Sequence, residues 1–78
     1  MTNYEKFVAE LTKQYQELFT TPDYKFAALR HTPESLAKFM SDGLRADQAN
    51  KDGTGIKNTC KALKIKYTYC GIATYLNS

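Results

Sequence analysis

The sequence has little of the chemistry that enzymes and metal proteins rely on. Its 78 residues contain no tryptophan, two cysteines and one histidine. A structural zinc site needs four ligands, so these three residues do not make one. No pair of carboxylates stands out, and the sequence places no nucleophile or orienting carboxylate beside His31. We therefore expect no metal, no cofactor and no enzymatic activity.

Long apolar runs are also missing. The chain has no stretch of eighteen apolar residues and no basic-then-apolar leader, so we expect neither a membrane span nor a signal peptide, and a cytoplasmic protein. Apolar residues still make up 42% of the chain, with six tyrosines and four phenylalanines, which is enough for a packed core. A chain of this length makes a single domain, residues 1–78.

The first helix is the clearest pattern in the chain. Apolar residues alternate by four and three from residue 4 to residue 18, which places them on one face of a helix. Thr2 and Glu5 have the spacing of a capping box at its start. We predict a helix over residues 3–20 whose apolar face consists of Tyr4, Val8, Leu11, Tyr15 and Leu18, flanked by Phe7 and Phe19.

Two prolines mark the starts of the next two helices. Each follows a threonine and precedes an acidic residue, which gives a cap, a first-turn proline and a favourable charge. We predict a short helix over residues 24–30 whose Phe26, Ala27 and Leu29 side chains face the core. For the helix that begins near Pro33 we predict an apolar stripe of Leu36, Phe39 and Met40.

Gly43 leaves the end of that third helix open. The helix either stops there in a left-handed cap or continues to about Ala49 at a cost of about 1 kcal/mol, and we favour the cap. Residues 3–50 then form the helical core. A polar loop follows in which Asp52-Gly53 indicates a turn and Thr54 can cap the next helix.

Two further helical patterns lie in residues 55–77, on either side of Lys64-Ile65-Lys66. Apolar residues three and four apart define their inner faces, Ile56, Cys60 and Leu63 in the first and Tyr69, Ile72, Ala73 and Leu76 in the second. Ile65 is placed to tuck into the angle between them. We predict that Cys60 and Cys70 are both buried there as free thiols. A strand over residues 65–69, where apolar and polar residues alternate, is the second interpretation.

This spacing resembles the helix-turn-helix family, with small Cys60 at the helix crossing and Leu63, Ile65, Cys70 and Ala73 facing inward. The chain departs from the family at Lys64, where such turns favour glycine because of the left-handed backbone. The resemblance implies an all-α fold, a small orthogonal bundle of four to five short helices, and a DNA-binding regulator. The second helix, about residues 67–77, would then enter the major groove, with Gly71 allowing close approach. If Thr68 caps this helix instead, the helix is shorter and the base-facing residues begin at Tyr69 and Cys70.

The charge distribution favours the same function. Residues 1–50 carry six basic and seven acidic side chains, whereas residues 51–78 carry five lysines and one aspartate. Cationic charge is therefore concentrated on the helix-turn-helix-like unit, as a nucleic-acid surface requires. The residues expected to contact double-stranded DNA or another partner are Lys57, Asn58, Lys61, Lys64, Lys66, Tyr67, Thr68 and Tyr75. The alternative for these lysines is an ordinary solvated face.

A protein-binding function is the other hypothesis. The chain resembles the small, basic, helical proteins of phages and other mobile elements, some of which cover the nucleic-acid-binding surfaces of host defence complexes such as CRISPR effectors. The resemblance implies an inhibitor of a host protein complex, of the anti-CRISPR type, with tyrosines as interface anchors. For the apolar face of the first helix we favour burial against the chain's own domain, because two heptads are too few to form a coiled coil alone. A homodimer that pairs through this face and reads two DNA half-sites is the alternative.

Overall fold

The capping box predicted at the start of the chain is present and opens α1 (Asn3–Leu18). The Thr2 hydroxyl accepts a hydrogen bond from the Glu5 N–H at 3.1 Å, and the Thr2 N–H donates to the Glu5 carboxylate at 3.0 Å. The bond from the Thr2 backbone N–H, with a smaller contribution from the Thr2 side chain, lowers the pKa of Glu5, because it stabilises the charged carboxylate. The computed structural model describes residues 1–42 and 54–77, and α1 is its longest helix.

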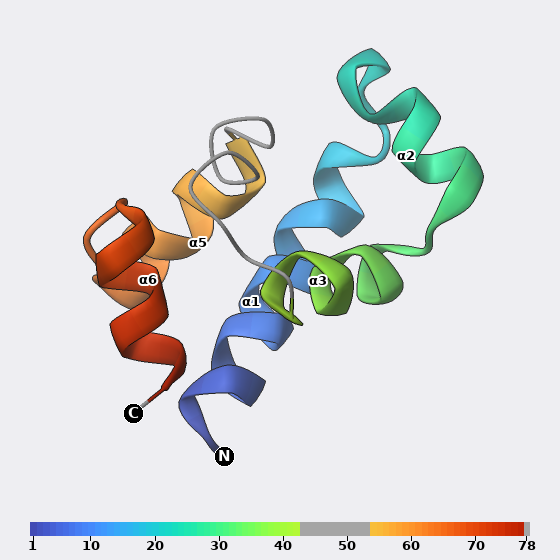
Figure 1. Ribbon diagram of the computed structural model, residues 1–78. Helices are drawn as coiled ribbons and strands as arrows, with labels where there is room; N and C mark the ends of the chain where they lie inside the picture. The colour runs from blue at the N-terminus through green and yellow to red at the C-terminus, as the bar shows by residue number, and fades with distance from the viewer. Residues whose placement is uncertain (43–53, 78) are drawn as a thin grey trace.

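The remaining described elements are short helices, and no strand occurs among them, which confirms the all-α fold class. They are η1, a 3₁₀-helix (Pro22–Tyr24), α2 (Lys25–Arg30), α3 (Pro33–Asp42), α5 (Thr54–Leu63) and α6 (Tyr69–Leu76). Figure 1 shows α1 passing through the middle of the molecule, with α3 on one side and α5 and α6 on the other. The packing of α1 against α3 is the most extensive, followed by α5 and then α6.

The core forms where α3, α5 and α6 meet α1. Phe7, Leu11 and Tyr15 have no exposed surface, and Phe7 is central to the core and not at its flank as predicted. Ile56 of α5 and Ile72 of α6 are equally buried. The apolar face of α1 is therefore used within the chain. This is the use favoured from the sequence, and Val8, Leu11 and Tyr15 of this face are buried against the other helices.

The inner face of α3 differs from the predicted stripe. Leu36 and Met40 are buried as expected, but Phe39 is 57% exposed. Ala37 and Ser41 are buried in its place, so the buried face of the helix includes two small side chains. The Tyr4 hydroxyl donates a hydrogen bond to the Asp42 carboxylate, which ties the end of α3 to the start of α1. This bond is the main cause of a raised Tyr4 pKa.

The helix after Pro22 also corrects the prediction. It begins as the 3₁₀ turn η1, and α2 has no buried residue. Phe26 and Leu29, both expected inside, are 78% and 76% exposed. Ala27 alone of the three packs partly against the core. The reason is that α2 has six residues, and its only extensive packing among the described elements is with η1.

An aromatic group joins η1 to the bundle. The rings of Tyr15, Phe19 and Tyr24 lie 5.7 to 6.1 Å apart, centroid to centroid. The Tyr24 hydroxyl accepts a hydrogen bond from the Gly55 N–H at 3.3 Å, which fixes the start of α5. Thr54, expected as a cap, is the first residue of that helix. The predictions for Gly43 and for the Asp52-Gly53 turn lie outside the described residues.

Candidate nucleic-acid interface

The outer face of α5 carries three of the predicted site residues. Ile56 and Cys60 are buried, so the opposite side of the helix faces away from α1. Lys57, Asn58 and Lys61 are exposed on that side, three and four residues apart. The two lysines therefore follow one another along the same outward face.

The turn after α5 is a Schellman motif built on Lys64. Its φ of 58° lies in the left-handed region that favours glycine. The resemblance to helix-turn-helix units implies this backbone conformation at Lys64. The Ile65 N–H donates to the Cys60 carbonyl at 2.8 Å, and the Lys64 N–H donates to the Lys61 carbonyl at 3.4 Å. Ile65 packs partly against the core, as predicted, and the Lys64 side chain is left exposed.

The first turn of α6 is fixed by Thr68. Its hydroxyl accepts a hydrogen bond from the Gly71 N–H at 3.0 Å, and its own N–H donates to the Lys66 carbonyl at 2.8 Å. The helix thus begins at Tyr69, two residues later than the favoured start and as the alternative with Thr68 as cap predicts. Residues 64–68, where a strand was the second interpretation, form the connection between α5 and α6. Because the Thr68 hydroxyl oxygen accepts this bond, its evident role is to position α6.

Gly71 is needed for a reason that the sequence did not reveal. A Cβ atom at this position would lie 2.6 Å from the Lys66 carbonyl oxygen and 3.0 Å from the Thr68 hydroxyl. The space beside Gly71, which was predicted to allow the close approach of DNA, is therefore taken up by the Lys66 carbonyl of the connection.

The later start of α6 changes which side chains are exposed. Tyr69 is 45% exposed and Cys70 is also exposed, so the predictions that place both inside are wrong. Ile72 is the buried residue of the helix. Tyr75, predicted to reach the partner, is half-buried and packs against the core. Its carbonyl accepts a hydrogen bond from the Asn3 side-chain amide at 3.1 Å.

Seven of the eight predicted site residues are thus exposed, and they lie on α5 and on the connection to α6. Tyr75 is the exception. The packing of α5 and α6 against each other is slight compared with the packing of each on α1. Residues 54–77 contain no acidic side chain, and none of their lysines forms an ion pair with a described residue. The result is a cationic surface, which we call the α5–α6 surface: Lys57, Asn58, Lys61, Lys64, Lys66, Tyr67 and Tyr69.

The two thiols have different surroundings. Cys60 is buried, and burial raises the pKa of its thiol to about 11, so it is a poor nucleophile at neutral pH. Cys70 lies on the exposed side of α6 and is also free. The shared crossing expected for the two cysteines is therefore not formed.

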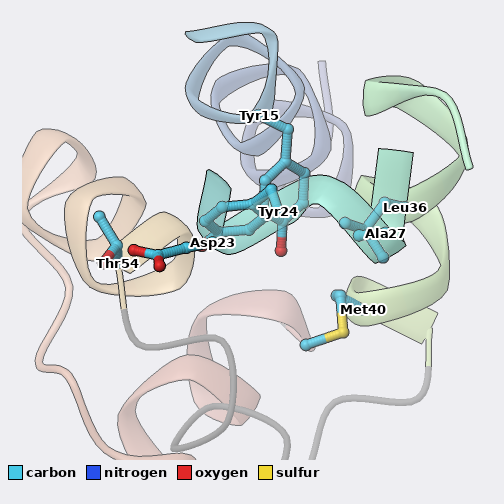
Figure 2. A pocket seen from close by; sticks show the side chains of 7 residues that line it. All are labelled: Tyr15, Asp23, Tyr24, Ala27, Leu36, Met40 and Thr54. Atoms are coloured by element: carbon cyan, nitrogen blue, oxygen red, sulfur yellow. The ribbon is translucent and has the colours of Figure 1, made fainter. Parts of the chain in front are cut away.

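A hollow of about 430 Å³ lies on another part of the molecule, between η1, α2, α3 and the start of α5. Figure 2 shows its lining, with Asp23 and Thr54 on one side and Met40 on another. Its walls are mainly apolar and hold one carboxylate, that of Asp23, together with the rings of Tyr15 and Tyr24. No sequence pattern indicated this hollow, because its residues come from elements far apart in the chain.

No group of three or more potential metal ligands occurs among the residues described. None of the helices in that part of the chain has the length and apolarity that a membrane crossing requires. No family model matches the chain, and comparisons with curated proteins and with solved structures likewise give no match.

Proposed function

We propose that the protein binds double-stranded DNA through the α5–α6 surface and acts as a small regulator. The observation that carries the proposal is the charge of this surface, which has four exposed lysines and no acidic side chain in residues 54–77. Phosphate contacts from lysine supply most of the affinity of such proteins for nucleic acid. Lys57 and Lys61 follow the outer face of α5, and Lys64 and Lys66 extend the charge into the connection.

The start of α6 would then lie nearest the bases. Tyr69 and Cys70 are exposed in its first turn, and Tyr67 precedes the cap. These side chains favour contacts with thymine methyl groups and sugars over bidentate hydrogen bonds, so we expect modest sequence discrimination.

The left-handed backbone of Lys64 also supports the proposal. A side chain at this φ costs about 1 kcal/mol or more relative to glycine, yet the position holds a charged residue. A phosphate contact from Lys64 explains why the turn carries lysine in place of the conformationally favoured glycine.

Titration of a fluorescent duplex with the protein at several salt concentrations tests the proposal. We expect binding at low salt and an affinity that falls steeply as salt rises, because binding releases counterions from the DNA phosphates. The double variant Lys61→Glu/Lys64→Glu should abolish binding and keep its helical circular dichroism. The matched control Lys6→Glu/Lys13→Glu changes the same charge on the exposed side of α1 and should bind much more strongly than that variant. Absence of binding to duplex at low salt would overturn the proposal.

A second candidate function is binding to an acidic host protein through the same surface, of the kind that inhibits a nucleic-acid-binding complex. Tyr67 and Tyr69, 37% and 45% exposed beside the lysines, favour this candidate because tyrosine is enriched in protein interfaces. A complex with one host protein that persists at high salt, together with no duplex binding, would select this function over DNA binding.

A further inference from the structure

We propose that α2 is a docking surface for an acidic amphipathic helix of a partner protein, distinct from the α5–α6 surface. The surface consists of Lys25, Phe26, Leu29 and Arg30, and we call it the α2 surface. Figure 1 shows α6 near the N-terminal end of α1 and α2 beyond the C-terminal end of α1. The two surfaces therefore lie on different parts of the molecule. The proposal does not depend on DNA binding.

The apolar part of the α2 surface is unusually exposed. Phe26 and Leu29 lie three residues apart, with 78% and 76% of their surface accessible. Leu29 also lines a shallow groove of about 550 Å³ between α2 and the end of α1, together with Phe19, Pro22 and Ala28. A leucine and a phenylalanine beside an apolar groove form the kind of site that receives the apolar face of a helix.

The charges of α2 define the partner. Successive residues of a helix advance by about 100°, so Leu29 and Phe26 lie about 40° and 100° around the axis from Lys25, and Arg30 about 140°. The apolar pair is therefore bordered by a cation on each side. A partner helix whose apolar stripe is bordered by glutamates or aspartates would match both borders, and Arg30 can hold a carboxylate with two hydrogen bonds.

Nearby acidic residues do not neutralise these cations. Asp23 lines the hollow of Figure 2, and Glu34 forms an ion pair with Lys38 at 3.3 Å on α3. The same charges disfavour a second copy of the chain as the occupant, since two facing α2 surfaces would bring Lys25 and Arg30 of one copy against those of the other. Phosphate-rich partners are disfavoured by the apolar centre. Charge complementarity thus selects an acidic helix.

A charge-swap experiment tests the proposal. The probes are two amphipathic helical peptides with the same leucine stripe, bordered by glutamates in one and by lysines in the other. We expect the full-length protein to bind the glutamate peptide at least about tenfold more tightly, with amide NMR shifts in residues 25–30. The variant Lys25→Glu/Arg30→Glu should reverse the preference. Phe26→Ser/Leu29→Ser should lose binding to both peptides and, because both residues are exposed, keep the circular dichroism of the wild type.

Three results would overturn the proposal. Equal or undetectable binding of the two peptides would show that the charges do not select a partner. Self-association that disappears in Phe26→Ser/Leu29→Ser, measured by sedimentation, would assign the surface to a second copy. Loss of duplex binding in Lys25→Glu/Arg30→Glu would assign it to nucleic acid. Failure of the DNA proposal alone, with the peptide preference intact, would leave the α2 surface as proposed.

Discussion

Lys64 is unfavourable for the turn after α5, but its side chain adds a positive charge to the α5–α6 surface. Its φ of 58° closes the Schellman motif after α5, and glycine would adopt that angle with less strain. Its charge, however, belongs to the cationic surface. The departure from the helix-turn-helix pattern was visible in the sequence, and the structure shows that Lys64 adopts the left-handed backbone that such turns require.

We predict that Lys64→Gly stabilises the fold and weakens DNA binding. Relief of the left-handed strain, offset by the greater freedom of glycine in the unfolded chain, should raise the free energy of unfolding by about 0.5 to 1 kcal/mol. Urea unfolding followed by circular dichroism measures this gain, and salt-dependent duplex titration measures the loss. Lys57→Gly is the matched control: it should lower stability, because Lys57 lies within α5. A destabilised Lys64→Gly variant would contradict the strain argument.

Residue exposure was predictable where helical position and charge agree. The lysines of α5 lie opposite a regular apolar stripe, and the structure exposes them as predicted. Phe26 and Leu29 were not predictable in this way, because apolar character alone does not show whether a short helix finds a surface to pack on.

At the scale of the element, the start of α6 decides the shape of the candidate interface. Sequence pattern located the helix, but helix ends depend on local hydrogen bonds that periodicity does not report. The Thr68 cap moves the start to Tyr69, and this change exposes Tyr69 and Cys70. The connection then folds back on Gly71, leaving no room there for a Cβ atom.

We predict that this start is sensitive to two small changes. Thr68→Ala should lower the free energy of unfolding by about 1 kcal/mol through loss of the cap, and Thr68→Ser should restore most of it. Gly71→Ala should cost about 1 to 3 kcal/mol, because the new methyl group meets the backbone carbonyl of Lys66. Cys70→Ala, at the neighbouring exposed position, should change stability by less than about 0.5 kcal/mol. Urea unfolding compares the four variants, and an unchanged Gly71→Ala would refute the steric argument.

For the whole molecule, the all-α fold and the long first helix could be predicted, since the periodicity of residues 4–18 is strong. The way in which the other helices use α1 could not. The sequence suggested a closely packed final pair with both thiols inside, but α5 and α6 each pack mainly on α1. Which helix packs on which depends on side chains from distant segments of the chain. The periodicity within each segment does not show this.

The two thiols offer a measurement of this arrangement. We predict that Cys70 of the native protein reacts rapidly with a disulfide reagent, whereas Cys60 reacts only when the bundle unfolds. Burial excludes the reagent from Cys60, and its pKa of about 11 leaves little thiolate at pH 8. The fast phase should amount to one equivalent and disappear in Cys70→Ser. Rapid reaction of two equivalents would contradict the packing of α5 on α1.

The hydrogen bond from Asn3 to the Tyr75 carbonyl has a consequence for synthesis of the chain. It joins residues 72 positions apart, and the interior takes Phe7 from the first helix and Ile72 from the last. While the ribosome is still translating residues before Ile72, the apolar stripe of α1 has no cover from α6. Chaperones that recognise such stripes would therefore meet this polypeptide before its interior can close.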